Sequence, residues 1–152
     1  MVSEITSENF ISDSTLFIRD ILRENIVDPL ARLGSGTSFI YTSYPKDDIK
    51  YPIITVKPMN TADIRRLGMQ SEKVAMSLPY EIRVWGRNEK EKDNLTQDVY
   101  NHLRGNQFGA GSETSNVGLH DFNCTSMISI DEPGEEGVKS KVMTYSYLYI
   151  NQ

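Results

Sequence analysis

Cysteine and histidine are scarce in this chain of 152 residues, which contains one cysteine, Cys124, and two histidines. A lone thiol cannot form a disulfide within the chain, and it cannot supply the thiolates of a metal cluster. The cysteine content therefore suits a reducing compartment.

The chain also lacks an excess of positive charge and long apolar runs. The formal net charge is -5 and the isoelectric point is near 5.0. This argues against a broad basic face for nucleic acid, because such binding depends on neutralising phosphates. The segment MVSEITSENF has neither a basic start nor an apolar run, and no segment approaches the roughly 20 apolar residues that span a bilayer. We therefore expect a soluble protein with no membrane contact and no ordinary export signal.

The chain does have enough apolar material for one domain. Hydrophobic residues make up 38% of the sequence, and no long polar or repeated tract interrupts them. A chain of this length can bury a modest core. Residues 1–152 are therefore predicted to form a single domain.

The segment STLFIRDILRENIVDPLARLG has the period of an amphipathic helix. Apolar residues recur at three- and four-residue spacing, which places them on one face. They are Phe17, Ile18, Ile21, Leu22 and Ile26. Ser14 is available as the N-cap, and Pro29 should kink or end the helix near Val27.

Strand-like stretches follow this helix. FIYTSYP and YPIITVKP are rich in β-branched and aromatic residues and are bounded by proline, which predicts a hairpin or adjacent strands. Between Val74 and Trp85, apolar residues return with the alternation of a strand. The intervening residues 59–73 show no sustained period and are predicted to form a long loop, a kind of connection that is often functional.

A second helix is predicted directly after Trp85. Asn88 and Glu91 have the spacing of a capping box, and Gly105 is a good C-terminal stop. A narrow apolar stripe marks the face that should be buried. It consists of Leu95, Val99 and Leu103.

Two closing strands, HDFNCTSMISIDEP and KVMTYSYLYI, complete the pattern. The order of elements is therefore α-β-β-β-α-β-β. We expect an α/β (α+β) fold, with a mostly antiparallel sheet of about five strands and both helices packed on one face. The strands are expected within residues 39–56, 76–85 and 122–150.

The last strand is apolar or aromatic on both faces. One face carries Val142, Leu148 and Ile150, and the other carries Met143, Tyr145, Tyr147 and Tyr149. Helices on one side of a sheet leave the second face without cover, and an uncovered apolar face usually marks an interface. One interpretation is that other subunits cover the tyrosines and Trp85. The alternative is that the tyrosines lie on a solvated face and loop packing hides the tryptophan.

Arg65 and Arg66 form the best local basic feature of the chain. Guanidinium groups can bind the carboxylates of a partner surface. The pair stands among the apolar residues Ile64, Leu67 and Met69, and a mixed apolar and basic strip is typical of protein contacts. We predict a subunit contact here, with two solvated loop arginines as the alternative.

The sequence offers little material for catalysis. His120 lies close to Cys124, and a histidine can activate a thiol, but the strand pattern predicts a buried, inert cysteine. GAGSETS lacks the lysine and the following helix of a phosphate loop. The clustered acids lack the ligand spacing of a calcium loop; they are Asp47, Asp48, Asp131, Glu132, Glu135 and Glu136. We expect no enzyme activity, no cofactor and no metal.

The succession of an N-terminal helix, YPIITVKP, a long loop, PYEIRVWGRNEKEKDNLTQDVYNHL and two closing strands resembles the tail-completion proteins, or tail terminators, of long-tailed bacterial and archaeal viruses. The resemblance covers nearly the whole chain in the order of its elements. It implies an α/β subunit of a hexameric ring at the head-proximal end of the tail, assembled in the host cytoplasm. The implied partners are the tail tube protein and a neck or connector protein, with genome DNA passing through without specific binding.

Two other functions remain open from the sequence. The nearer is another head-tail connector or neck ring protein, or a tube subunit, built on the same sheet. The farther is a small α/β ligand-binding domain with a metabolite pocket, for which the sequence shows no motif.

Overall fold

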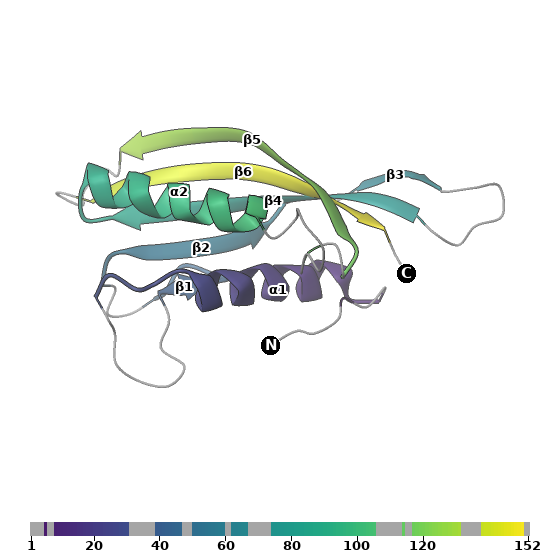
Figure 1. The fold of residues 1–152 in the computed structure, drawn as a ribbon, viewed down its shortest axis with the longest axis horizontal. Coiled ribbons are helices and arrows are strands. Elements are labelled where there is room, and N and C mark those ends of the chain that lie inside the picture. Colours follow the sequence, from purple (N-terminus) through teal and green to yellow (C-terminus); the bar gives the residue numbers. More distant parts are fainter. Residues whose placement is uncertain are drawn as a thin grey trace.

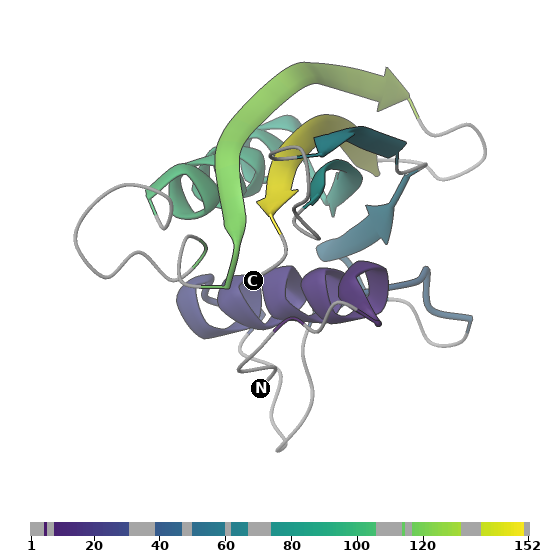
Figure 2. The same ribbon diagram turned by 90° about the vertical axis from the view of Figure 1, so that its right-hand side faces the viewer.

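The chain forms an α+β fold in which the helices lie on one side of a curled sheet (Figures 1 and 2). The computed structural model describes residues 5, 8–30, 39–46, 50–59, 62–66, 74–105, 114, 117–131 and 138–150, with the backbone alone at 62–66, 74 and 131. Its elements are α1 (Phe10–Asn25), β1 (Ile40–Tyr41), β2 (Ile53–Pro58), β3 (Ala62–Arg66), β4 (Val74–Gly86), α2 (Glu89–Gly105), β5 (Leu119–Asp131) and β6 (Lys139–Ile150). The predicted fold class is confirmed.

The sheet has the strand order β1-β2-β4-β6-β5, and β3 pairs with the first part of β4. Every described strand pair is antiparallel except β1 with β2, in which Ile40 lies opposite Ile54. The sheet is therefore mixed. For FIYTSYP and YPIITVKP we predicted a hairpin or adjacent strands, and the structure confirms the adjacent strands. The two strands are adjacent but parallel, which a tight turn cannot produce.

Helix α1 lies against β1 and β2, and its predicted apolar face is buried. Its cap differs from the prediction, because the N-cap is Asn9 and Ser14 is buried inside the helix. The Ser14 hydroxyl is hydrogen-bonded to the hydroxyl of Tyr80 on β4. The burial of Ser14 therefore depends on a tyrosine that is distant in the sequence, which the local sequence does not show. The helix ends at Asn25, before Val27, as expected from Pro29.

Helix α2 follows the sequence prediction closely. The Asn88 side chain accepts a hydrogen bond from the backbone N–H of Glu91 at 2.9 Å. The Glu91 carboxylate accepts one from the backbone N–H of Arg87 at 3.0 Å. The stripe of Leu95, Val99 and Leu103 is buried against β4 and β6.

Part of the predicted loop 59–73 is a strand. Residues Ala62–Arg66 form β3, which pairs with β4 between Val74 and Ser77 across an irregularity at Asp63 and Arg65. The stretch ADIRR has no alternation of its own, so the pairing with β4 determines its conformation. We call β3 and the part of β4 paired with it the arm, because they extend past the ends of both helices (Figure 1).

Candidate subunit interface

The predicted tyrosine interface is part of this chain's own core. Tyr145, Tyr147 and Tyr149 are 0%, 1% and 2% exposed. They lie on the face of β6 that the helices cover; Tyr145 stacks on Tyr80 at 5.5 Å between ring centroids, and both Tyr145 and Tyr147 contact Phe122. The prediction that other subunits cover these rings is therefore wrong, and so is the solvated alternative. Alternation along β6 separated its two faces but did not show which one the helices cover.

The hydroxyls of this cluster differ in their partners. The Tyr147 hydroxyl donates to the backbone oxygen of Leu103 at 3.4 Å, whereas the buried Tyr145 hydroxyl has no hydrogen-bond partner among the described residues. Burial raises the pKa of Tyr80 to about 12, and it raises the pKa values of Tyr145 and Tyr147 well above the usual range. All three phenols therefore keep their protons at neutral pH.

This difference predicts opposite effects for two matched substitutions. Tyr145→Phe should raise the free energy of unfolding by about 1 kcal/mol, because it removes a buried hydroxyl that loses its water without gaining a partner. Tyr147→Phe should lower that free energy by about 1 kcal/mol, because it removes a hydrogen bond and leaves the Leu103 oxygen without this donor. Urea unfolding of the two variants beside the parent chain measures both changes. Equal destabilisation by the two variants would show that Tyr145 has a partner.

Trp85 lies on the opposite face of the sheet and is also covered by its own chain. It is 8% exposed. The ring of Tyr44 meets it edge-on at 5.1 Å between centroids, and the Arg83 guanidinium lies 4.9 Å from the indole centroid. The Tyr44 hydroxyl is hydrogen-bonded to that of Tyr51 at 2.8 Å, so the segment between β1 and β2 forms this cover. The alternative, in which loop packing hides the tryptophan, is therefore confirmed, and the interpretation that another subunit covers Trp85 is wrong.

The arm is the predicted contact that reaches outward. It carries Ile64, Arg65 and Arg66 on β3, for which the structure describes the backbone only. Leu67 and Met69 lie outside the described residues. Figure 1 shows β3 beyond the ends of α1 and α2, at the end of the sheet where β4 begins. The role of these residues in a subunit contact stays a prediction.

A second exposed surface, not predicted from the sequence, lies on β5. Among the described strands β5 pairs with β6 only, so its other edge is open. Met127, Ile128 and Ile130 on this strand are 39%, 57% and 38% exposed. A long edge strand with exposed apolar residues tends to pair with another chain unless something covers it. The uncharged run TSMISI could have indicated an exposed apolar strand, but a sequence does not show which strand lies at the edge of the sheet.

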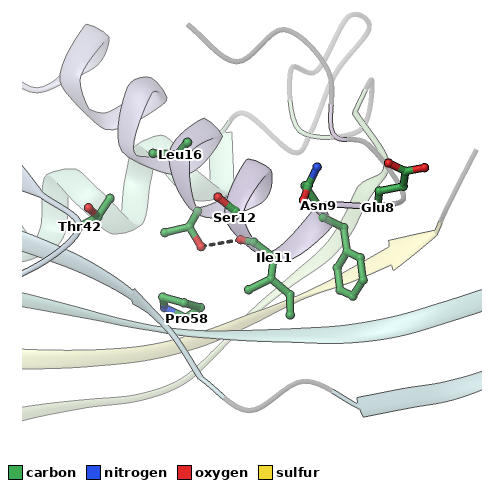
Figure 3. Close-up of a pocket in the computed structure, with 9 residues that line it drawn as sticks. Glu8, Asn9, Ile11, Ser12, Leu16, Thr42 and Pro58 are labelled. Carbon is green, nitrogen blue, oxygen red and sulfur yellow. Dashed lines mark hydrogen bonds between the residues drawn. The ribbon is translucent and has the colours of Figure 1, made fainter.

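A cavity of about 480 Å³ lies between the first half of α1 and the end of β2. Its lining is mainly apolar, with Phe10, Ile11, Leu16 and Pro58 joined by Glu8, Asn9, Ser12, Thr15 and Thr42. Figure 3 shows Ile11 extending from the helix toward the sheet, with Glu8 and Asn9 at the start of α1. Sequence reasoning missed this cavity because its walls come from separate parts of the chain.

The Cys124 thiol, predicted to be buried, is only half-buried in the structure. Burial raises the pKa of the Cys124 thiol, which is the opposite of activation, and its sulfur lies 3.7 Å from the Ser126 oxygen. Within the part of the chain that the structure describes, no group of three or more His, Cys, Asp or Glu side chains could hold a metal ion. The acids at 47, 48, 132, 135 and 136 lie outside that part, as does the side chain of Asp131.

No protein-family model matches this sequence, and no curated protein matches it either. The helices within the described residues include none that is long and apolar enough to cross a membrane.

Proposed function

We propose that this chain is a structural virion protein, a tail terminator subunit that forms a ring at the head-proximal end of a viral tail. In this role it ends growth of the tail tube and joins the tail to the neck. Its partners are further copies of itself, the tube protein and a neck or connector protein. It acts in the virion at the junction of tail and neck, after assembly in the host cytoplasm.

The observation that carries this proposal is the arm. Strand β4 is continuous from Val74 to Gly86, and its first part pairs with β3 on one side and with β6 on the other, where Ala75 lies opposite Ile150. The arm is therefore anchored in the sheet and held away from the helices (Figure 1). A hairpin that extends past the helices and carries Arg65 and Arg66 is well suited to contact a neighbouring subunit.

The open edge of β5 supports the same proposal. It lies on a different strand from the arm, so one subunit offers two different surfaces to its neighbours. Contacts between unlike surfaces repeat from head to tail and give a ring when the rotation closes. The net charge of -5 also suits a conduit that DNA crosses without adhering, because like charges repel.

Native mass spectrometry across a concentration series, with negative-stain images of the same samples, tests the proposal. We expect closed rings, sixfold if the resemblance to tail terminators holds. Open-ended tubes would instead indicate a tube subunit, and a compact dimer would favour the small ligand-binding domain. If the chain stays monomeric, it should still bind the ends of purified tail tubes; a monomer that leaves tube ends bare would contradict the proposal.

The double variant Arg65→Glu, Arg66→Glu should fold normally and fail to assemble. Both positions lie on the arm, which extends past the ends of the helices, and the new charges would repel the carboxylates that we expect on the partner. Sedimentation velocity should show a loss of the ring species at every concentration tested. The control is Lys90→Glu, Arg104→Glu, which makes the same change in net charge at two exposed positions of α2. Normal assembly of the arm variant would show that these arginines are not the contact.

A further inference from the structure

We infer that the open edge of β5 pairs with the same edge of a second copy of this chain, as two antiparallel strands related by a twofold axis. The inference goes beyond the proposed ring, because it concerns the free chain before a ring forms. The contact consists of residues 126–130, all of which the structure describes, on the outer strand of the curled sheet (Figure 2).

The opposite edge of the sheet shows how this fold protects an edge strand. Strand β1 has two residues, and the backbone oxygen of Ile40 accepts hydrogen bonds from the Arg23 guanidinium at 3.0 and 2.7 Å. Short strands and charged groups commonly keep an edge from pairing with other copies. Strand β5 has 13 residues, with no charged side chain between Asp121 and Asp131. The described residues of β5 therefore lack the protection found at β1.

The last half of β5 exposes apolar side chains on both faces. Met127 lies opposite Met143, on the face that the helices cover, and Ile128 lies opposite Val142 on the other face. Met127 and Ile128 are 39% and 57% exposed, and Ile130 is 38% exposed. A strand added beside β5 removes these side chains from water and pairs the backbone groups that point away from β6.

The segment that follows the arm begins too far away to cover these side chains. The arm meets β6 at Ile150, whereas Ile128 is opposite Val142, eight residues back along β6. That separation is about 26 Å at roughly 3.3 Å per residue. Residues 67–73 are fixed at both ends by β3 and β4, so they reach about 14 Å at most. They cannot lie over Ile128.

Two segments next to β5 in the sequence do not provide the cover either. Residues 106–113 precede the first residue of β5, Leu119, which is nine positions before Ile128, or about 30 Å away. Residues 132–137 adjoin the end of β5, but their sequence is EPGEEG, with three glutamates and no apolar side chain besides the proline. An acidic segment of this kind gains little by covering isoleucines.

The remaining long segments adjoin other parts of the fold. Residues 31–38 and 47–49 adjoin β1, which is four strand spacings, or about 19 Å, from β5. The N-terminal residues lead through the buried Ile5 to Phe10, which stacks on Tyr149 at the far end of β6. The occupant of the open edge therefore comes from another molecule.

A second copy fits this edge by symmetry and by charge. Each copy carries the same open strand, and a twofold antiparallel pair gives both copies identical backbone hydrogen bonds. Edge strands that avoid their own copies often carry a lysine or another charge. Strand β5 is uncharged from Phe122 to Ile130, and antiparallel pairing places the Asp131 residues of the two copies at opposite ends of the contact. No like charges therefore oppose one another across the axis.

The irregularities of β5 determine the register of the pair. Pairing with β6 shifts just before Ser126 and is regular from there to the end of β5. Opposed residues of paired strands point to the same face, so the twofold axis passes at a residue rather than between two. An axis at Ile128 uses the whole regular stretch. The opposed pairs are then Ser126 with Ile130, Met127 with Ser129, and Ile128 with itself.

The twofold pair and the proposed ring use the edge of β5 in different ways. The subunits of a ring all point in one direction, whereas a twofold axis turns one copy over. The two contacts therefore exclude each other at β5. The pair is a form of the free chain in which the edge stays covered until a neighbouring subunit or a tail displaces the second copy.

Disulfide formation between two copies tests the register directly. In a Cys124→Ser background, Ile128→Cys supplies the only thiol. Directly opposed residues have Cα atoms roughly 4.5–5.5 Å apart, which is within the range of a disulfide. Mild oxidation should therefore link most of the Ile128→Cys protein into covalent pairs.

The matched control is Ile130→Cys in the same background. In this register Ile130 meets Ser126 of the second copy and not itself, so its yield should stay at the level of random collision. A mixture of Ile130→Cys with Ser126→Cys should form a covalent pair that contains one copy of each. Equal yields for Ile128→Cys and Ile130→Cys alone would overturn the pairing.

A surface substitution gives an independent measurement. Ile128→Lys should fold, since the side chain is already more than half exposed, and should weaken self-association of the free chain by roughly tenfold or more, because two ammonium groups would oppose each other at the axis. The control is Val27→Lys, which adds the same charge at an 84% exposed valine beyond the end of α1. Sedimentation equilibrium measures the association, and thermal melting confirms the fold of both variants.

The outcomes separate this inference from the proposed function. Rings that form while Ile128→Cys gives no specific link, and Ile128→Lys associates like Val27→Lys, would overturn the pairing and leave the ring proposal standing. A specific link without any ring, alone or on tube ends, would support the pairing and overturn the ring. A chain that shows neither the link nor any assembly would overturn both.

Discussion

Val99→Asp is expected to unfold the chain. Val99 is 0% exposed on α2, in the stripe that packs against β4 and β6. An ionised carboxylate at this position would lose its water without gaining a partner, at a cost of several kcal/mol. Small domains have only about 5–15 kcal/mol of stability in total. Circular dichroism should therefore show a weak or absent cooperative melt at temperatures where the parent chain is folded.

The matched control for this substitution is Asn94→Asp on the same helix. Asn94 is exposed, so the new carboxylate stays in water and the free energy of unfolding should change by about 0.5 kcal/mol or less. The pair therefore separates the effect of burial from that of charge on α2. If Val99→Asp melted cooperatively near the parent midpoint, the stripe on α2 would not be core.

Features that depend on neighbouring residues could be predicted from the sequence. The cap of α2 formed in part as the spacing of Asn88 and Glu91 indicated. The Asn88 side chain accepts from the N–H of Glu91 within one helical turn, and the Glu91 carboxylate accepts from the N–H of Arg87. The buried faces of α1 and α2 also followed from periodicity. The two faces of β6 were separated correctly, since alternation along a strand is a property of the backbone.

Features that depend on distant partners could not be predicted. Ser14 is buried, and its hydroxyl is hydrogen-bonded to that of the distant Tyr80. Trp85 is covered by Tyr44, which lies in the segment between β1 and β2. Strand β3 depends on pairing with β4 and lacks alternation of its own. Which face of β6 the helices cover, and which strand lies at the edge, are properties of the assembled sheet.

The same distinction applies to the candidate interface. The arm was indicated by a local mixture of Arg65 and Arg66 with apolar neighbours, and its role in assembly remains a prediction. The cavity was not indicated, because α1, β2 and Thr42 create it only when they pack together. The exposed edge of β5 was missed for the same reason. Sequence alone therefore indicated a local feature of the chain and could not show the surfaces that packing creates.

Gly86 lies at the junction of β4 and α2, where the strand and the helix are in close contact. Gly86→Val should therefore lower the free energy of unfolding by about 3 kcal/mol. A Cβ at this position would lie 2.8 Å from the backbone nitrogen of Lys92 and 3.0 Å from its Cα. These atoms belong to the helix backbone, so the clash cannot be relieved by rotating a side chain. Lys92 is also fixed at its other end, where its ammonium contacts Glu89 at 2.5 Å and Ser129 at 3.2 Å.

Urea unfolding of Gly86→Val beside Gly105→Ala measures this constraint. Gly105 ends the same helix with nothing within 4 Å of an added Cβ, so its substitution should be neutral or slightly stabilising. A large loss of stability for Gly86→Val but not for Gly105→Ala would show that the loss comes from close contact between strand and helix rather than from helix propensity. A midpoint for Gly86→Val equal to that of the parent would mean that α2 can move away from β4 at little cost. The burial of Trp85, which directly precedes Gly86, would then not require a rigid junction between β4 and α2.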